Sequence, residues 1–227
     1  MPHRLLLFDI DGTLITSGGA GEGALKDAVQ QFLGEDEDLK SITIAGATDS
    51  GIARALLKAH GREQTPENIA GLIDRYLTLL PERLTEHPGR VLPGILELLT
   101  RLRACEGVAM ALLTGNMRRG AEIKLSHYGV WHFFEFGAFA DDHHDRNELG
   151  KFAAARARDA HGVEFEADQI YVIGDTPRDI ACGRAIGAKT VAIATGNYSR
   201  KELAKDEPDF LFDDFSDVDS VYAALTR

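Results

Sequence analysis

Short apolar runs alternate with helical patterns along most of the chain. Runs that are apolar except at their first residue stand at 4–8, 169–173 and 190–194, a wholly apolar run stands at 108–113, and two weaker runs stand at 133–139 and 210–212. The helical patterns between them cover residues 93–103, 120–128, 149–161 and 179–186. A short, wholly apolar run is typical of a strand buried on both faces of a parallel sheet. The alternation therefore predicts an α/β fold with a Rossmann-like parallel-sheet core.

Residues 16–92 interrupt this alternation. They contain helical patterns at 23–33, 50–60 and 66–84 but no convincing core strand. We expect this segment to be an inserted all-helical cap domain, with residues 1–15 and 93–227 forming the α/β core. Clusters of Gly and Pro at 16–21 and 87–94 are the expected hinges. An insertion directly after the first strand lies over one end of the sheet, where it can serve as a lid.

Composition narrows the range of partners. The chain has 227 residues, with 25 basic and 36 acidic side chains, so its formal charge is −11 and its pI is about 5.2. This charge disfavours binding to nucleic acid or to an anionic membrane. We expect a cytoplasmic protein, because the sequence shows no signal-peptide pattern and no apolar run of membrane-spanning length. Cys105 and Cys182 lack C-x-x-C spacing and indicate neither a disulfide framework nor a zinc site.

Two carboxylates directly follow the first apolar run. If the chain stays extended there, Asp9 and Asp11 point to the same side and can share a cation. One can then act as a nucleophile while the other donates and accepts a proton. Gly12 and Thr13 permit a sharp turn and offer N–H groups to a phosphate. A capping turn is the plainer alternative, and an EF-hand calcium loop is disfavoured because Gly12 is fourth, not sixth, from Asp9.

Polar residues also follow the second run. Thr114, Gly115 and Asn116 offer a hydroxyl, an unhindered backbone N–H and an amide, which are neutral donors suited to a phosphoryl oxygen. The alternative for this tripeptide is a turn followed by a helix N-cap. The carboxyl ends of parallel strands meet at one edge of a sheet, where ligands bind. We therefore expect Thr114 to lie close to Asp9.

A further pair of carboxylates and two basic residues complete the candidate site. Asp175 follows the run at 169–173 and is a better candidate metal ligand than Asp179, because it is nearer the strand end. Asp179 either contacts the metal or caps the following helix. A reaction at phosphate also needs a cation. Arg146 precedes Asn147, a plausible N-cap, and Lys151 lies in the first turn of the following helix. We prefer Arg146, because a lone helical lysine is usually solvated.

Together these motifs resemble the four motifs of the haloacid dehalogenase superfamily. They occur in the family's order: Asp9-Ile10-Asp11-Gly12-Thr13, Thr114-Gly115-Asn116, a basic residue, and Gly174-Asp175-Thr176-Pro177-Arg178-Asp179. Many members have Lys-Pro at the third motif, where this chain has Arg146-Asn147. The helical cap and residues 91–94 are similar to those of phosphoglycolate phosphatase-like hydrolases. Similar cap loops often carry a basic residue where Ala47 stands here.

The resemblance implies a mechanism and a cofactor. Asp9 would form a phosphoaspartate, Asp11 would be the general acid and base, and Thr114 with the basic residue would bind the phosphoryl group. Mg²⁺ would be held by Asp9, the carbonyl of Asp11 and Asp175. The chain is thus expected to hydrolyse a small phosphorylated metabolite. A sugar-phosphate mutase and a non-catalytic phosphate-binding module remain alternatives, and the oligomeric state stays open.

Overall fold

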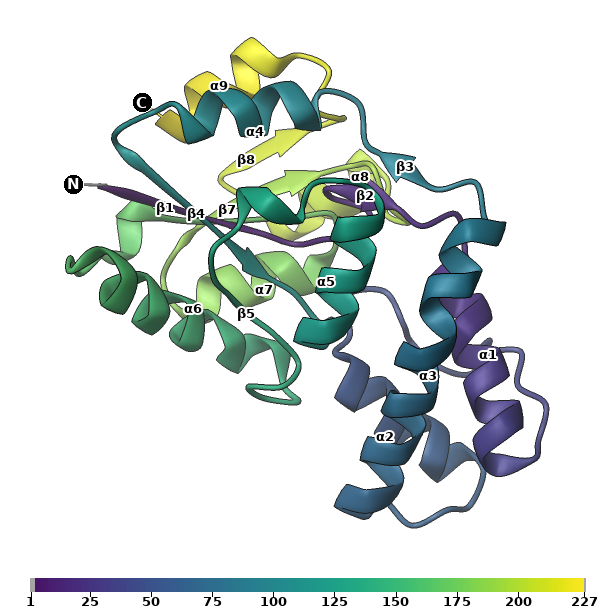
Figure 1. The fold of residues 1–227 in the computed structure, drawn as a ribbon. Coiled ribbons are helices and arrows are strands. Elements are labelled where there is room, and N and C mark those ends of the chain that lie inside the picture. Colours follow the sequence, from purple (N-terminus) through teal and green to yellow (C-terminus); the bar gives the residue numbers. More distant parts are fainter. Residues whose placement is uncertain (1–2, 227) are drawn as a thin grey trace.

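The computed structural model describes residues 3–226 and contains a six-stranded sheet (Figure 1). The strand order is β5-β4-β1-β6-β7-β8, and each neighbouring pair is parallel. The strands are β1 (Arg4–Phe8), β4 (Val108–Leu113), β5 (Gly137–Ala138), β6 (Ile170–Gly174), β7 (Lys189–Ile193) and β8 (Phe210–Phe212). This sheet with flanking helices confirms the predicted α/β class.

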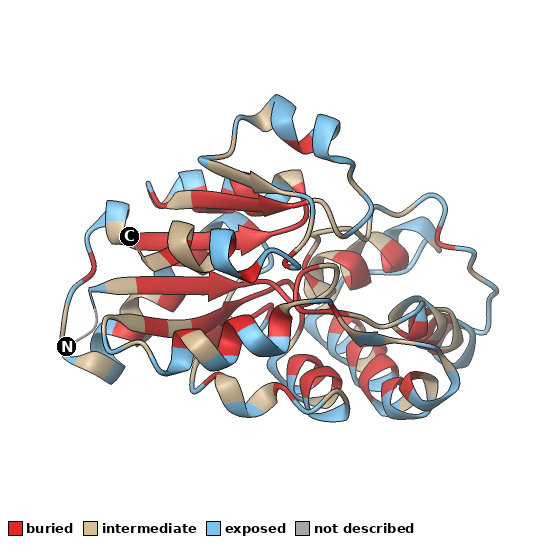
Figure 2. Ribbon diagram, turned by 90° about the horizontal axis from the view of Figure 1, so that it is seen from above, coloured by how far each residue is buried: buried red, intermediate tan, exposed pale blue. Residues whose placement is uncertain are grey.

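Helices cover both faces of the sheet, which explains why its strands are apolar throughout. Leu6 and Phe8 pack into the cluster that includes α4 and α9, whereas Leu5 and Leu7 pack against α6 on the opposite face. All four side chains are fully buried. Figure 2 shows that much of the sheet's backbone is coloured as buried. The flanking elements are α4 (Ile95–Arg103), α5 (Arg118–His127), η1 (Trp131–Phe133), α6 (Arg146–His161), η2 (Ala167–Gln169), α7 (Pro177–Ala185), α8 (Arg200–Leu203), η3 (Ala204–Asp206) and α9 (Val218–Thr226).

Three helices form a separate cluster beyond one end of the sheet (Figure 1). They are α1 (Ala20–Leu33), α2 (Asp49–Ala59) and α3 (Pro66–Glu86), and they share an apolar core that includes Leu56, Leu72 and Leu80. The chain enters and leaves this cap through β2 (Ile15–Thr16) and β3 (Arg90–Val91), which pair antiparallel. Within residues 3–226, no helix has both the length and the apolar character needed to cross a bilayer.

Two sequence-based expectations about local structure are wrong. The predicted strand at 133–139 is reduced to β5, because Trp131–Phe133 forms a 3₁₀ turn and the aromatic residues beside it pack into the core. Phe134, for example, meets Phe8 edge to face with 6.0 Å between ring centroids. In addition, α6 begins before the expected N-cap Asn147. The carboxylate of Asp145 is the true cap and accepts the N–H of Asn147 at 3.0 Å.

A histidine joins two segments of the cap through two carboxylates. The two ring nitrogens of His60 lie 2.8 Å from Glu35 Oε2 and 2.9 Å from Glu37 Oε2. Carboxylates only accept hydrogen bonds when ionised, so both ring nitrogens must carry protons to satisfy both contacts. The hydrogen bond to Glu35 raises the pKa of His60, although burial opposes this effect. The imidazolium therefore ties the end of α2 to the segment after α1.

We expect this contact to make the cap more stable at low pH. A folded-state pKa above the unfolded value gives a stabilisation that is complete below the unfolded pKa and is lost as pH rises through the folded pKa. His60→Gln should therefore lower the free energy of unfolding more at about pH 5.5 than at about pH 9. Urea denaturation of both proteins at the two pH values measures this difference.

Glu37→Gln provides the matched control, because it keeps the ring and removes one carboxylate. It should weaken the same pH dependence. An equal effect of His60→Gln at both pH values would contradict a charged ring.

Candidate active site

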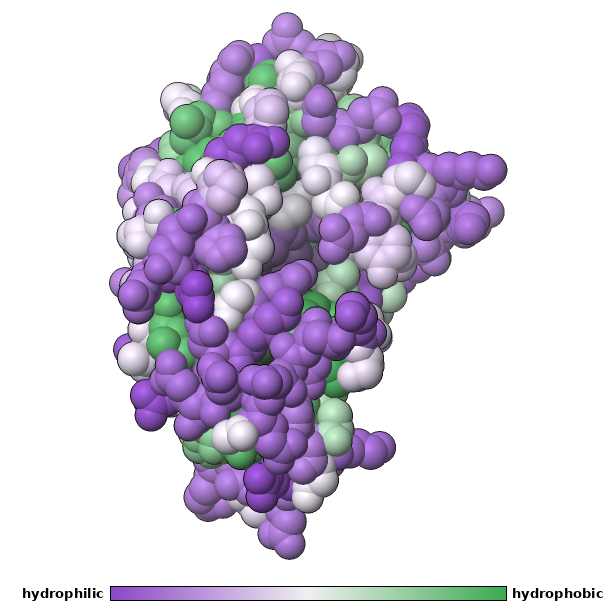
Figure 3. All heavy atoms as spheres, turned by 90° about the vertical axis from the view of Figure 1, so that its right-hand side faces the viewer, coloured by the Kyte–Doolittle hydropathy of each residue, from purple (hydrophilic) through white to green (hydrophobic). Residues whose placement is uncertain are grey.

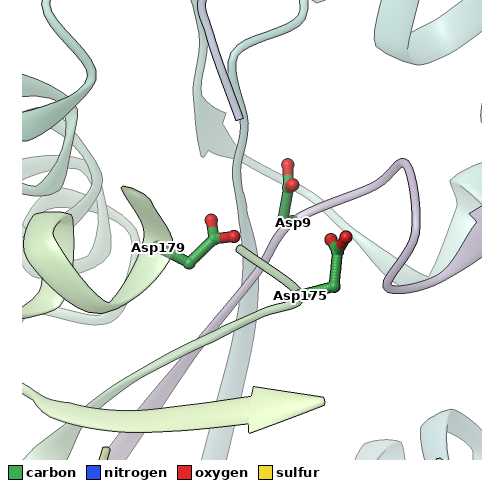
Figure 4. Close-up of side chains that lie close together, drawn as sticks. All are labelled: Asp9, Asp175 and Asp179. Atoms are coloured by element: carbon green, nitrogen blue, oxygen red, sulfur yellow. The ribbon is translucent and has the colours of Figure 1, made fainter. Parts of the chain in front are cut away.

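Three buried carboxylates meet at the carboxyl edge of the sheet. Asp9 follows β1, Asp175 follows β6, and Asp179 lies in the first turn of α7. Their exposed fractions are 5%, 3% and 2%, and one oxygen of each lies within 4.8 Å of the others. Figure 4 shows the three side chains gathered at this point. A backbone hydrogen bond holds the end of β1 beside the end of β6, since the N–H of Asp9 donates to the carbonyl of Ile173 at 2.9 Å.

Burial makes Asp9 and Asp175 hard to ionise. It raises the pKa of Asp9 to about 6, even though Arg146 acts in the opposite direction. Burial also raises the pKa of Asp175 well above its ordinary value, and the nearby charges of Asp179 and Asp9 add to this shift. Like charges in a region of low dielectric repel strongly, so the cluster favours a bound cation or a proton.

Arg146 supplies one positive charge to the cluster. Its Nη2 lies 3.2 Å from Asp9 Oδ1 and forms a short contact with Asp179, while Nη1 donates to the carbonyl of Gly46 at 3.2 Å. Burial alone would lower the pKa of this guanidinium, but Asp179 and Asp9 outweigh it and raise the pKa. Lys151 lies outside the cluster, because its side chain is 61% exposed and pairs with Glu148 at 2.7 Å. Of the two candidate cations, Arg146 is the one at the site.

The turn after Asp9 packs tightly against Asp175. Gly12 has φ +80°, and a Cβ there would collide with the Asp175 carboxylate, so both its conformation and its surroundings require glycine. The hydroxyl of Thr13 donates to Asp175 Oδ1 at 3.1 Å. However, the N–H groups of Gly12 and Thr13 donate to the carbonyls of Ile15 and Ile10. These two N–H groups are used within the turn and do not face a phosphate, contrary to the sequence-based expectation.

Asp179 caps α7, which is one of the two roles that the sequence left open. Its Oδ2 accepts hydrogen bonds from the N–H of Thr176 at 3.0 Å and from the Thr176 hydroxyl at 2.7 Å, forming a capping box at the start of α7. Its other oxygen contacts Arg146. The carboxylate therefore begins the helix and holds the guanidinium, while still lying within the carboxylate cluster.

Asp11 belongs to a second polar cluster beside the first. Its Oδ2 lies 2.6 Å from Lys124 Nζ and accepts a hydrogen bond from the Asn116 amide at 3.0 Å. The same amide donates to the Thr114 hydroxyl at 2.9 Å, and Asn116 Oδ1 accepts from Lys124 at 2.7 Å. The Thr114-Gly115-Asn116 motif thus contacts Asp11 through its amide, which its sequence did not reveal.

Lys124 is the residue at this site that was missed in the sequence. It lies in α5, is only 4% exposed, and contacts Asp11 from 113 positions away. Burial alone would lower the pKa of its ammonium, but Asp11 and other anionic neighbours raise it. One signal was available: Gly120, Ala121, Lys124 and Leu125 share the buried side of α5, so the lysine stands on the apolar stripe of its helix.

The cap is docked directly on these clusters. The carbonyl of Ala47 lies so close to Gly115 that a Cβ would collide with it, and Gly115 in turn accepts the N–H of Asp49 at 2.7 Å. The Asp49 carboxylate accepts the N–H of Met117 at 2.7 Å, and the Thr48 hydroxyl donates to the carbonyl of His144 at 2.6 Å. Burial raises the pKa of Asp49 to about 6 against the influence of Lys124.

A cavity of about 710 Å³ joins the two clusters to the cap. Its floor includes Asp9, Asp11 and Asp175, and its walls come from α1, α2, α3 and the segment at 38–47. Figure 3 shows a mostly hydrophilic outer surface on the cap side, with a hollow near its centre. A volume in this range is typical of a small-molecule site.

The carboxylate cluster fits a divalent cation. Three buried carboxylates face one guanidinium, so ionised oxygens remain in excess, and burial makes that excess costly. Oxygen ligands of this kind suit Mg²⁺, which binds through one or two carboxylates and keeps part of its water shell. The Asp11 carboxylate lies outside this group and contacts Lys124.

A parallel sheet with a carboxylate cluster at its carboxyl edge, covered by a helical cap, is the architecture of a capped hydrolase with a Rossmann-like core. The chain belongs to the haloacid dehalogenase-like hydrolase family, whose model matches residues 6–193. It is 26% identical to a probable phosphatase, IndB, of Dickeya dadantii, over 98% of this chain and 95% of that protein. It is also 26% identical to a phosphoglycolate phosphatase of Haemophilus influenzae, over 96% and 97% of the two chains.

Solved structures show the same fold. A predicted phosphoglycolate phosphatase of Haemophilus somnus matches with a TM-score of 0.72 and 21% identity, over 97% of each chain. CbbY of Rhodobacter sphaeroides, in complex with phosphate, matches with a TM-score of 0.75 and 19% identity, over 96% of each chain. The family match and the named relatives confirm the predicted family and the predicted phosphatase class.

The contacts of Arg146 predict a clear difference between the two basic residues. Arg146→Met should lower the free energy of unfolding by about 3 kcal/mol, because it leaves the carboxylates of Asp9 and Asp179 buried without their cation. Lys151→Met should leave stability nearly unchanged, since its side chain is exposed. Urea denaturation of the metal-free proteins measures both. Equal effects of the two substitutions would contradict the assignment of Arg146.

Proposed function

We propose that the protein hydrolyses a small phosphate monoester in an Mg²⁺-dependent reaction that passes through an aspartyl-phosphate at Asp9. The observation that carries the proposal is the arrangement around Asp9: a buried carboxylate in contact with Arg146, beside Asp175 and close to the separate Asp11–Lys124 pair. This division gives two carboxylates different surroundings at one edge of the sheet. Different surroundings allow one carboxylate to act as the nucleophile and the other as the general acid and base.

In the first step, a carboxylate oxygen of Asp9 attacks phosphorus and the bond from phosphorus to the leaving oxygen breaks. Asp11 gives a proton to that oxygen, so the leaving group departs as a neutral alcohol. Arg146 and the Thr114 hydroxyl bind the phosphoryl oxygens. Thr114 can donate its proton, because it already accepts a hydrogen bond from the Asn116 amide.

In the second step, water attacks phosphorus and Asp11 accepts its proton. The bond to Asp9 breaks, phosphate leaves, and the Asp9 carboxylate is restored. Lys124 and Asn116 hold Asp11 in place for both transfers through contacts of 2.6 and 3.0 Å. A carboxylate fixed in this way keeps the distance to the reacting oxygen that proton transfer needs.

The metal ligands in this proposal are Asp9, Asp175 and the carbonyl of Asp11, with Asp179 beside them. Mg²⁺, when bound, would offset the negative charge shared by the nucleophile and the phosphoryl group. Asp175 is well placed for this role, since Thr13 fixes one of its oxygens at 3.1 Å and Gly12 leaves space for the carboxylate.

The proposal predicts that activity depends on Asp9 and on the metal. Asp9→Asn should lower Mg²⁺-dependent phosphate release from p-nitrophenyl phosphate by about a thousandfold or more, because an amide is a poor nucleophile. Chelation of the metal should abolish the wild-type activity. Asp159→Asn is the matched control, since that carboxylate is 73% exposed on α6. Activity of Asp9→Asn at the wild-type level would contradict the proposal.

Asp11 should be needed for turnover but not for metal binding. Asp11→Asn should slow turnover by about a hundredfold or more and let the phosphoenzyme accumulate, because no group is left to activate water. Mass spectrometry after acid quenching detects the added phosphate, and calorimetry with Mg²⁺ compares the affinity of this variant with that of Asp175→Asn. We expect only Asp175→Asn to lose metal affinity. Normal turnover by Asp11→Asn would rule out the role given to Asp11.

A further inference from the structure

The cap side of the cavity carries a patch of apolar side chains beside its charged residues. Its walls carry branched and aromatic side chains from every cap helix and from the segment before α2. Most are largely buried within the cap core. The main contributors are Leu25, Leu39, Ile44, Ile52, Ile73 and Tyr76. The part of the substrate that extends away from phosphorus therefore meets an apolar surface.

The basic residues that line the cavity already have anionic partners. Arg146 contacts Asp9 and Asp179, and Lys124 contacts Asp11. Lys40, the cap's own lining cation, pairs with Asp38 at 2.9 Å, and its side chain is 84% exposed. Among the described lining residues, no basic side chain is left for a charge on the leaving group.

Acidic residues also line the cap side. Glu22 of α1 and Asp49 of α2 both face the cavity. A carboxylate entering here would lose water, gain no counter-charge and meet like charges. Each of these effects opposes its binding. An uncharged group would instead gain from the removal of apolar surface from water.

We propose that the cavity selects phosphate monoesters whose leaving group is uncharged and largely apolar, and that it disfavours carboxylate-bearing substrates such as phosphoglycolate. This inference rests on the proposed phosphatase function and narrows its substrate class. The cavity volume of about 710 Å³ supports it, because a two-carbon leaving group would leave most of that space to water.

The test compares two substrates that differ in charge but little in reactivity. Benzyl phosphate and 4-carboxybenzyl phosphate share the same benzylic leaving oxygen, and the carboxylate lies across the ring from it. We expect wild-type kcat/KM to be higher for benzyl phosphate by about tenfold or more, since the carboxylate must enter without a counter-charge. Phosphoglycolate, assayed beside them, should also be a poorer substrate than benzyl phosphate.

A substitution at Ala47 tests whether charge sets the preference for benzyl phosphate. It lines the cavity on the loop that lies over Gly115. Ala47→Lys would add a cation to the cap side and should narrow the ratio of the two kcat/KM values several-fold. Ala47→Met adds a chain of similar length without charge, and it should keep the ratio. A similar narrowing by both variants would show that size, not charge, sets the ratio, and would overturn the inference.

The outcomes separate this inference from the function on which it rests. Equal or better turnover of 4-carboxybenzyl phosphate, or faster turnover of phosphoglycolate than of benzyl phosphate, would overturn the inference and leave the phosphatase proposal intact. If the Mg²⁺-loaded protein released no phosphate from these substrates or from acetyl phosphate, beyond the Asp9→Asn background, the proposed function would fail and the inference with it.

Discussion

The guanidinium of Arg146 is the contact on which the site depends most. It lies 5% exposed between Asp9 and Asp179, and its Nη1 and Nη2 also donate to the carbonyls of Gly46 and Leu113. One side chain thereby joins the end of β1, the first turn of α7 and the cap loop. A planar group with several fixed donors can do this, whereas an ammonium offers only a point charge on a flexible stem. The arginine at the third motif is therefore a structural centre as well as a cation.

Through this contact, the position of the cap is tied to the charge of the site. The Gly46 carbonyl belongs to the loop that also places Ala47 against Gly115 and Asp49 against Met117. A cap that moved away would remove an acceptor from Arg146 and expose Asp49 further, since its side chain is half-buried in the docked state. Closure thus changes the hydration of charged groups on both sides of the cavity. Electrostatic interactions inside a closed site become stronger as water leaves.

Much of this molecule could be predicted from local sequence patterns. The apolar run at residues 5–8 indicated a central strand. The positions directly after β1 and β6 placed Asp9 and Asp175 at one edge, because parallel strands share their direction. The helical patterns of the cap gave α1, α2 and α3 to within a few residues. These features depend on neighbours in the sequence or on the general geometry of parallel sheets. For this reason they needed no knowledge of tertiary contacts.

The features that were missed depend on contacts between distant segments. Lys124 was not among the predicted site residues, and the packing of α3 against α5 buries it beside Asp11. The short β5 reflects the packing of Phe134 and Phe139 into the core, which removes them from strand pairing. The N–H groups of Gly12 and Thr13 were expected at a phosphate because nothing local showed that Ile15 and Ile10 would accept them. In each case the local structure depends on a long-range or turn-specific contact that neighbouring residues in the sequence do not reveal.

The two clusters together explain why the site keeps its carboxylates apart. Asp9 and Asp175 share one region with an excess of negative charge, in which a divalent cation or a proton is favoured. Asp11 is only two positions from Asp9, but its carboxylate contacts Lys124 and Asn116 and does not add to the negative charge of that region. If its carboxylate also entered the first cluster, four carboxylates would compete for one guanidinium and one metal. In the proposed reaction, the contact with Lys124 therefore keeps Asp11 apart from the metal site, where it can transfer protons.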